Sequence, residues 1–216
     1  MVSTSWWLKG PKRVFDVIAS LVILLLLSPL LILTTLLVKL TGPGSLFFTQ
    51  KRGGKNGVAF RAMKFRTMRG DRTPDPKELV PLKHPDITPI GWVLRRFKID
   101  ELPQLINVLK GEMSLIGPRP TLPDQIAAYD DFRRQRLLIR PGLTGLAQVY
   151  SNADAPWDER ILYDIAYVRR CSLWLDLAIL WRTLWVILAG ERSTTRPFRT
   201  TRFARCLPIP DDFHAS

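Results

Sequence analysis

A long uncharged segment near the N-terminus is the feature that most limits what this chain can fold into. The run from Val17 to Val38 covers 22 residues without a charged side chain. As a straight helix it would measure about 33 Å, and the hydrocarbon core of a bilayer is about 30 Å thick. The run is too long for a cleaved signal peptide, and no small-residue cleavage site follows it. The segment therefore predicts a membrane element and not a buried core helix.

Two features indicate how this segment enters the membrane. Ser28-Pro29 lies near its middle, where proline removes a helical hydrogen bond and produces a kink. Cations flank the segment on both sides: Lys9, Lys12 and Arg13 before it, and Lys39, Lys51, Arg52 and Lys55 after it. Because such flanks tend to stay in the cytoplasm, we favour a re-entrant helix that breaks at Ser28-Pro29 and returns. A kinked span is the alternative, since proline also occurs in ordinary transmembrane helices.

The charge of the chain indicates an anionic partner. Its 216 residues include 32 Lys+Arg and 19 Asp+Glu, which leaves a net charge of +13. Nucleic acid, anionic lipid and phosphorylated substrates all fit this charge. No groove-reading motif is present and the uncharged segment does not suit a nucleic-acid binder, so we expect no nucleic-acid partner. The two cysteines and two histidines show no ligand spacing, so a zinc site is not expected.

Two further segments are expected at the membrane surface. Residues 1–13 combine two tryptophans with cations, which suits the membrane–water interface. Residues 173–188 have a helical pattern in which three tryptophans share one face: Trp174, Trp181 and Trp185. Asp176 and Arg182 would each cost roughly 2.5 to 3.5 kcal/mol at mid-bilayer, so we expect an interfacial amphipathic helix and not a second span.

The rest of the chain predicts a mainly helical domain with a small β-hairpin. Residues 46–50 and 58–65 have strand patterns joined by a turn rich in glycine and cations, which we interpret as a plain β-turn and not as a phosphate cradle. The proline-rich residues 69–91 indicate a surface loop. Residues 124–138 and 158–170 have helical patterns, and the arginines of the first (Arg133, Arg134 and Arg136) are expected on a solvated or lipid-facing surface. The basic C-terminal tail is expected to be mobile or membrane-apposed.

Two adjacent carboxylates, Asp100 and Glu101, precede Pro103 in what the sequence predicts to be a helix start. Beside the positive end of a helix dipole and several cations, they should stay ionised at neutral pH. An ionised Asp is a competent nucleophile toward phosphorus, and Arg119 between two prolines is suited to bind phosphate through two donors. This pattern suggests phosphoryl transfer. The alternative is that Asp100 only caps a helix and Arg119 pairs with a surface acid.

Eight motifs together resemble the bacterial sugar transferase family of monotopic phosphoglycosyl transferases, in their short form, over about residues 10–190. They are Lys12-Arg13-Val14-Phe15-Asp16, Ser28-Pro29, Phe48-Thr49-Gln50-Lys51-Arg52, Met63-Lys64-Phe65-Arg66-Thr67-Met68, Asp100-Glu101-Leu102-Pro103-Gln104-Leu105, Asn107-Val108-Leu109-Lys110-Gly111-Glu112-Met113-Ser114, Gly117-Pro118-Arg119-Pro120 and Arg140-Pro141-Gly142-Leu143-Thr144-Gly145. Departures from the family pattern include His84-Pro85-Asp86, Phe97-Lys98 and Leu146, which leave donor specificity unassigned.

The resemblance implies an enzyme that transfers a sugar-1-phosphate from a UDP-sugar to a polyprenol (undecaprenyl) phosphate and releases UMP. It implies Asp100 as the nucleophile, Glu101 as its acid/base or metal-side partner, and Mg²⁺ held near both carboxylates. Arg119 is implied as a phosphate-binding residue, with Lys64, Arg66 and Arg140 as further candidates. The implied location is the cytoplasmic face of the bacterial inner membrane, in contact with anionic lipid, and a homodimer is left open. An inactive membrane scaffold for glycan assembly is the alternative function.

The expected fold is therefore α+β and membrane-associated. Its first part, residues 1–41, is the re-entrant membrane helix with its basic and aromatic flank. Residues 42–190 form the catalytic domain, with the β-hairpin, the helices and the interfacial segment. Residues 191–216 form the basic tail.

Overall fold

The computed structural model describes residues 5–69, 84–151, 155–189, 196–210 and 213. The α-helices are α1 (Pro11–Leu26), α2 (Ser28–Leu40), α3 (Pro89–Arg96), α4 (Gln104–Lys110), α5 (Pro123–Ala127), α6 (Asp131–Arg134), α7 (Leu146–Tyr150), α8 (Trp157–Arg170) and α9 (Leu173–Ala189). The strands are β1 (Phe47–Gly53), β2 (Ala59–Phe65), β3 (Ser114–Ile116) and β4 (Gly142–Thr144). The 3-10 helices are η1 (Trp6–Lys9), η2 (Lys55–Gly57), η3 (Ile99–Glu101), η4 (Gln135–Leu138), η6 (Phe198–Thr200) and η7 (Ala204–Cys206). This mixture of helices and short strands agrees with the expected fold class.

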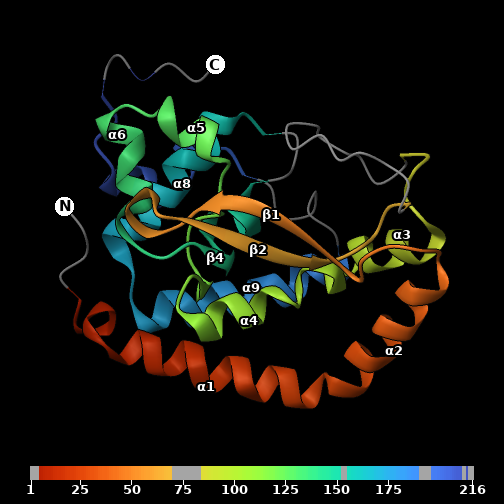
Figure 1. Ribbon diagram of the computed structural model, residues 1–216. Helices are drawn as coiled ribbons and strands as arrows, with labels where there is room; N and C mark the ends of the chain where they lie inside the picture. The colour runs from red at the N-terminus through yellow and green to blue at the C-terminus, as the bar shows by residue number, and fades with distance from the viewer. Residues whose placement is uncertain (1–4, 70–83, 152–154, 190–195, 211–212, 214–216) are drawn as a thin grey trace.

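Helices α1 and α2 form one bent arm along the lower edge of the molecule (Figure 1). The helices meet at Leu27 with a bend of 64°, and Ser28 Oγ donates to Leu25 O at 2.8 Å. The predicted break at Ser28-Pro29 is confirmed. In the described part of the chain no single helix is long and apolar enough to cross a bilayer, whereas this bent pair taken together is, by length and composition.

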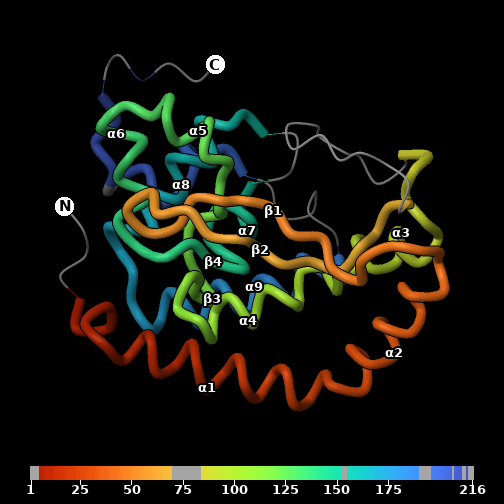
Figure 2. The backbone as a smooth tube through the Cα atoms, in the orientation of Figure 1, coloured from red at the N-terminus to blue at the C-terminus, as the bar shows by residue number. Residues whose placement is uncertain are grey.

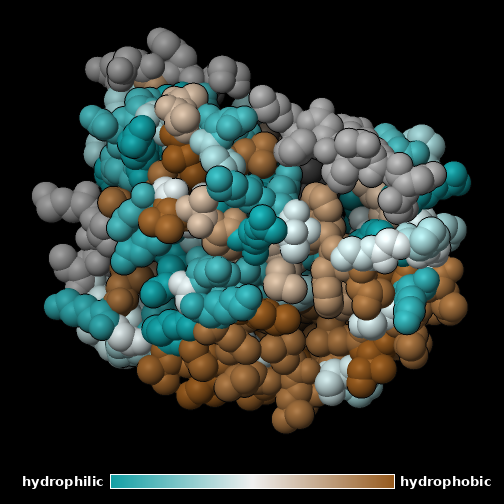
Figure 3. Space-filling view, viewed as in Figure 1, coloured by the Kyte–Doolittle hydropathy of each residue, from teal (hydrophilic) through white to brown (hydrophobic). Residues whose placement is uncertain are grey.

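The outer face of the bent arm is apolar. Its exposed side chains include Ile18, Leu25, Ile32 and Leu36, and hydrophobic surface gathers over the arm in the space-filling view, where the upper part of the molecule is mainly hydrophilic (Figure 3). Transfer of such side chains out of water is favourable by roughly 25 cal/mol per Å². A contiguous apolar face of this kind is typical of a surface that contacts lipid or a partner.

The inner face of α1 is polar and is bound to the rest of the protein. Lys12 and Asp16 are both buried, and Lys12 Nζ lies 2.7 Å from Asp176 Oδ2 at the start of α9. Arg13 donates to Val108 O and Leu109 O, which lie near the end of α4. Two of the cations predicted to face the membrane surface therefore bind protein groups, because their positions in α1 point them inward.

The predicted β-hairpin is confirmed, and it lies over α4 (Figure 2). Strands β1 and β2 are antiparallel, with Phe47 opposite Phe65. Asn56 and Gly57 both have a positive φ, of 55° and 79°, so the reversal uses residue types that adopt this conformation readily. Asn107 of α4 accepts from Met63 N and donates to Arg61 O, which fastens α4 to β2.

The main hydrophobic core surrounds α8, which confirms the helix predicted at 158–170. Its buried residues run from Ile161 to Val168. The parallel pair β3 and β4 joins the same core, where Tyr167 Oη lies 3.1 Å from Ile116 O. This core fixes β3, which leads directly into the Gly117-Pro118-Arg119-Pro120 loop.

The prediction of a single helix at 124–138 is wrong. The segment forms α5, α6 and η4 in succession, and Asp130 caps α6 by accepting from Arg133 N. The prediction that its arginines lie on a surface is also wrong for Arg136, which is only 2% exposed. Its guanidinium pairs with Asp164 and donates to Tyr129 Oη at 2.7 Å, so a buried acid on α8 explains its position.

Helix α9 has the two faces that the sequence predicts. Trp174 and Trp181 are 80% and 77% exposed, whereas Asp176 is fully buried. Arg182 donates to Val149 O at 3.1 Å and lies over the Tyr150 ring. Both charged residues therefore face protein, which leaves an apolar, tryptophan-rich outer face.

The expectation of a mobile C-terminal tail is wrong for its described residues, and the alternative of a membrane-apposed tail stays a prediction. Four apolar side chains of this segment are buried in the main core: Phe198, Phe203, Leu207 and Phe213. Arg196 N donates to Tyr150 O at 2.9 Å. Apolar residues spaced irregularly among arginines gave no periodic pattern, so the sequence did not reveal that they pack.

Candidate active site

A sharp turn between α3 and α4 places the two adjacent carboxylates. Lys98 has φ 59° and ψ 18°, a left-handed conformation that is uncommon for lysine, and η3 follows it directly. Asp100 and Glu101 lie in η3, and α4 begins only at Gln104, with Pro103 as its N-cap. The predicted helix start is therefore displaced by one 3-10 turn. Strained residues of this kind often lie at functional sites.

Glu101 is the centre of a cluster of cations. Its Oε1 lies 2.5 Å from Lys64 Nζ, at the end of β2, and 3.2 Å from Arg119 Nη2. Burial alone would raise the pKa of Glu101, but the charges of Lys64 and Arg119 outweigh burial and hold this pKa far below its usual range. Glu101 is therefore a fixed anion that keeps the Lys64 and Arg119 side chains in place.

Asp100 has the opposite environment. Burial, and then the neighbouring charge of Glu101, raise the pKa of Asp100 from 3.8 to about 6. Its Oδ1 is buried and accepts no hydrogen bond from the described residues. The helix-start argument did not include burial, although a pKa near 6 still leaves Asp100 mainly ionised at pH 7. A carboxylate oxygen without a donor retains more of its nucleophilicity than a paired one.

Close backbone contacts hold the loop that carries Arg119. A Cβ on Gly117 would lie 2.4 Å from Arg140 O, and a Cβ on Gly142 would lie 2.1 Å from Gly117 N. Gly142 N donates to Pro118 O, and Gly117 N donates to Thr144 O, both at 2.9 Å. The loop at 117–120 and the segment at 140–145 therefore form one unit, which needs glycine where the two backbones touch.

Arg136 fixes the Arg119 loop from the protein side. Its Nη2 donates to Arg119 O at 2.9 Å, and the same guanidinium pairs with the fully buried Asp164. Burial raises the pKa of Asp164 to about 6, with Arg136 acting in the opposite direction. The guanidinium of Arg119, in contrast, is 43% exposed, so its backbone is fixed while its side chain reaches solvent.

The sequence analysis expected the cations just before the carboxylates but did not include Arg52 among their neighbours. Arg52 on β1 is close enough to Arg119 and Glu101 to respond to both charges, and burial followed by Arg119 lowers its pKa to about 10. The expected cations Arg95 and Lys98 act against burial and lower the pKa of Asp100. Arg95 Nε donates to Thr67 Oγ1 at 2.9 Å. Arg52 and Thr67 belong to quoted motifs, so motif membership was the available signal.

Two predicted phosphate-binding residues lie outside this cluster. Arg66 donates to Pro43 O, Gly42 O and Val38 O, so it binds the end of α2 and the following turn. Arg66 follows the last residue of β2, and these carbonyls occupy its guanidinium. Arg140 donates to Gly111 O at 2.7 Å and lines a separate cavity of about 180 Å³ with Arg13 and Lys55.

The fit of a magnesium ion rests on Asp100 and Glu101. Among the described residues no group of three or more His, Cys, Asp or Glu is arranged to hold a metal. Mg²⁺, however, commonly uses one or two carboxylates and completes its shell with water and substrate phosphates. The two adjacent carboxylates, one with an unpaired buried oxygen, supply oxygen donors of this kind. The residues therefore fit a metal that is shared with a phosphate substrate.

Comparison with known proteins gives consistent matches. A model of the bacterial sugar transferase family matches residues 7–190. The exopolysaccharide production protein ExoY of Rhizobium meliloti is 43% identical over 197 residues, which cover 84% of this chain and 87% of that protein. A UDP-glucose:undecaprenyl-phosphate glucose-1-phosphate transferase of Caulobacter vibrioides is 41% identical over 84% of this chain and 71% of its own length. An undecaprenyl-phosphate galactose phosphotransferase of Salmonella typhimurium is 40% identical over 83% of this chain but only 41% of its own length.

Proposed function

The chain belongs to the bacterial sugar transferase family, and we propose that it transfers a sugar-1-phosphate from a UDP-sugar to undecaprenyl phosphate. The observation that carries this proposal is that Asp100, whose buried Oδ1 accepts no hydrogen bond from the described residues, adjoins Glu101 at the centre of the Lys64–Glu101–Arg119 cluster. The names of relatives specify glucose in one case and galactose in another. The transferred sugar is therefore a matter for direct assay.

In the first half-reaction a carboxylate oxygen of Asp100 attacks the β-phosphorus of the donor. A bond forms between this oxygen and phosphorus, and the bond from phosphorus to the bridging oxygen breaks, so UMP leaves with the electron pair. A phosphate leaving group needs no proton at neutral pH. This agrees with the low pKa of Glu101, which suits a permanent anion better than a general acid.

In the second half-reaction a phosphate oxygen of the acceptor attacks the same phosphorus. The acyl-phosphate bond to Asp100 breaks and the carboxylate is restored. Lys64, Arg119 and Arg52 would stabilise the charge on the equatorial phosphate oxygens in both steps. Because the donor leaves before the acceptor enters, one site can serve both substrates in turn.

Magnesium, when bound with the donor, would supply further neutralisation of the pyrophosphate charge. Asp100 and Glu101 are the residues that would hold it. The excess of cations around Glu101 already lowers the repulsion between a carboxylate nucleophile and an anionic donor.

We place the enzyme at the cytoplasmic face of the bacterial inner membrane. The bent arm of α1 and α2 would enter one leaflet, and the outer faces of α3 and α9 would lie at the interface, where Trp92, Phe97 and Trp181 are exposed. This placement sets the site near the depth of lipid phosphate groups, where the acceptor carries its reactive phosphate.

The test is UMP release by the purified full-length protein in detergent, with Mg²⁺ and undecaprenyl phosphate, across a panel of UDP-sugars. Asp100→Asn should abolish release, whereas Asp131→Asn, a matched change at an exposed carboxylate on α6, should not. Intact mass measurement without acceptor should show a phospho-sugar adduct on the parent only. Release by folded Asp100→Asn protein would refute the nucleophile, and no release with any donor would favour the scaffold function.

Membrane placement is tested separately by labelling in intact cells. A cysteine introduced near the N-terminus, at Ser3, should be shielded from a membrane-impermeant maleimide added outside, because a re-entrant helix keeps both flanks in the cytoplasm. Labelling of the cysteine at Ser3 from outside would instead support a kinked span, if a second cysteine introduced at Lys110 stays protected.

A further inference from the structure

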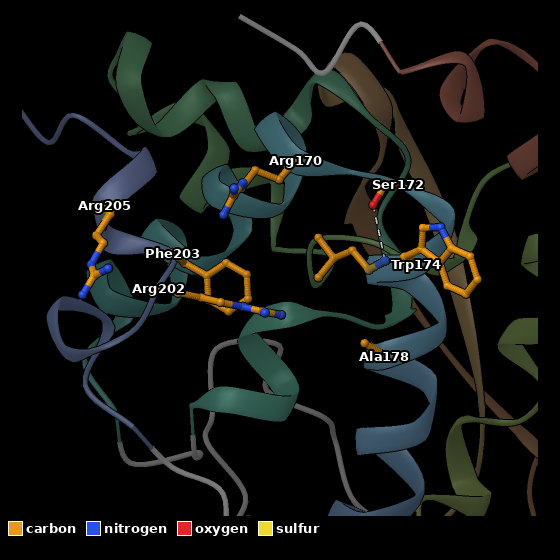
Figure 4. Close-up of a pocket in the computed structure, with 8 residues that line it drawn as sticks. Arg170, Ser172, Trp174, Ala178, Arg202, Phe203 and Arg205 are labelled. Atoms are coloured by element: carbon orange, nitrogen blue, oxygen red, sulfur yellow. Dashed lines mark hydrogen bonds between the residues drawn. The ribbon is translucent and has the colours of Figure 1, made fainter.

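A second concentration of arginines lies at the opposite end of α9 from Asp100. A cavity of about 530 Å³ opens there between the end of α8, the start of α9 and the C-terminal segment. Figure 4 shows Arg170 and Arg202 beside it, on α8 and the C-terminal segment, with Trp174 on the α9 side and Arg205, which also lines it, farther out on the C-terminal segment. None of the described residues that line it is acidic. A cavity with this lining selects for an anion.

The three arginines are held by different parts of the fold. Arg170 is the last residue of α8, and Arg202 and Arg205 lie on either side of the start of η7. All three side chains are exposed. Arg202 lies over the ring of Phe203, which is only 2% exposed and anchors this segment in the core. Planar guanidinium groups are suited to phosphate, whose several oxygens can accept from more than one arginine.

The remaining wall of the cavity is apolar and continues onto the outer face of α9. Trp174 lines it and is 80% exposed, and Trp181 and Trp185 lie further along the same exposed face. Exposed tryptophans of this kind are typical of the headgroup level of a membrane. The cavity therefore joins a phosphate-binding rim to a surface suited to acyl chains.

The length of α9 separates this cavity from the proposed reaction site. The helix has 17 residues and so measures about 25 Å. Near its other end Ile187 O accepts from Arg96 Nη1 at 2.9 Å, and Arg96 ends the helix that leads into η3 and Asp100. A lipid in the cavity would therefore not be the phosphate acceptor of the reaction.

We propose that this cavity binds the phosphate of an anionic phospholipid headgroup, with Arg170, Arg202 and Arg205 on the phosphate and the acyl chains beside Trp174. The bound lipid would fasten the C-terminal segment to the membrane surface. The proposal rests on the membrane placement given above but not on the transferase reaction.

Native mass spectrometry of the full-length protein in mild detergent tests this site, with equal amounts of phosphatidylglycerol and phosphatidylcholine added. The parent should retain phosphatidylglycerol preferentially. The triple variant R170Q/R202Q/R205Q should lose this preference by about tenfold or more, since each cation near an anionic headgroup contributes to binding. The matched variant K51Q/R61Q/K110Q removes the same charge at exposed positions on β1, β2 and α4, and it should keep the preference.

Equal loss in both triple variants would show a net-charge effect and overturn the site, as would no loss in R170Q/R202Q/R205Q. Displacement of the lipid by inorganic phosphate at comparable concentration would show a site for a free anion, which also overturns the proposal. UMP release in detergent by R170Q/R202Q/R205Q should match the parent. A protein that fails to release UMP but still selects phosphatidylglycerol would refute the reaction and leave the lipid site standing.

Discussion

Asp100 and Asp176 are both buried carboxylates, and their surroundings differ in every contact. Asp176 is fully buried and accepts from Trp7 Nε1 at 2.9 Å, Lys12 Nζ at 2.7 Å and Tyr167 Oη at 2.6 Å. Asp100 is 7% exposed, and its Oδ1 accepts from no described residue. A carboxylate that is saturated with donors joins elements together, whereas one left without donors keeps an oxygen available for reaction.

The comparison also separates two uses of positive charge. Lys12 is buried and compensates a buried acid, so its charge is neutralised within the fold. The guanidinium of Arg119 pairs with Glu101 but remains 43% exposed, so it can also reach a phosphate. Partial exposure therefore distinguishes the cation that we propose binds substrate from the structural one.

The sharpest way to break the first comparison is to replace each carboxylate by its amide. Asp100→Asn should lower UMP release roughly 10⁴-fold or more, because the nucleophile is lost. It should also stabilise the fold at pH 7, since the raised folded pKa of Asp100 corresponds to a penalty of about 3 kcal/mol. The gain should shrink as pH falls from about 6 toward 3.8, because Asp100 of the folded parent is protonated below about pH 6 and its penalty is lost.

Asp176→Asn should do the reverse and destabilise the fold by about 3 to 5 kcal/mol, because Lys12 loses its closest buried partner. Chemical denaturation in detergent, monitored at several pH values, measures both changes. If Asp100→Asn and Asp176→Asn changed stability in the same direction, the contrast between the two carboxylates would be wrong.

A second pair of variants sharpens the distinction between cations. Lys64→Met should lower kcat/KM for UMP release by roughly 10²- to 10³-fold, as expected when one stabilising donor is lost from a site of charge development. Arg66→Met, just after the end of β2, should leave kcat/KM nearly unchanged and instead lower stability by about 1 kcal/mol, because Arg66 binds carbonyls at and after the end of α2. Equal loss of activity in both would return Arg66 to the site.

The pH dependence of the first half-reaction gives the smallest but most specific effect. Single-turnover UMP release without acceptor should rise about tenfold per pH unit below pH 6 and level off above it, because Asp100 must be ionised and its pKa is raised to about 6. Omitting the acceptor removes the ionisation of its phosphate from the profile. A midpoint near 4 would show that Asp100 reacts from an environment unlike the one described.

The features that follow local rules could be predicted from the sequence. The break at Ser28-Pro29, the hairpin and the helix at α8 depend on proline, turn residues and periodicity, and all three are confirmed. The carboxylate pair could also be predicted, because Asp100 and Glu101 are adjacent in the sequence. Each of these predictions depends on residues that lie within a few positions of each other in the chain.

The features that depend on distant partners could not be predicted in this way. Arg136 is 28 positions from Asp164, and Trp7 is 169 positions from Asp176. Neither spacing forms a pattern in one sequence, so the arginine was assigned to the surface and the tryptophan to the membrane interface. Burial of Asp100 likewise arises from the whole fold, which is why its raised pKa was not anticipated.

The bend between α1 and α2 has a consequence for the choice of lipid. Helices of 16 and 13 residues measure about 24 and 20 Å, and neither matches a hydrocarbon core of about 30 Å. A spanning helix of fixed length responds to hydrophobic mismatch by tilting or by deforming the bilayer. With the arm seated in one leaflet, as we propose, no polar end has to reach the far side, so the enzyme should work equally well in thin and thick bilayers.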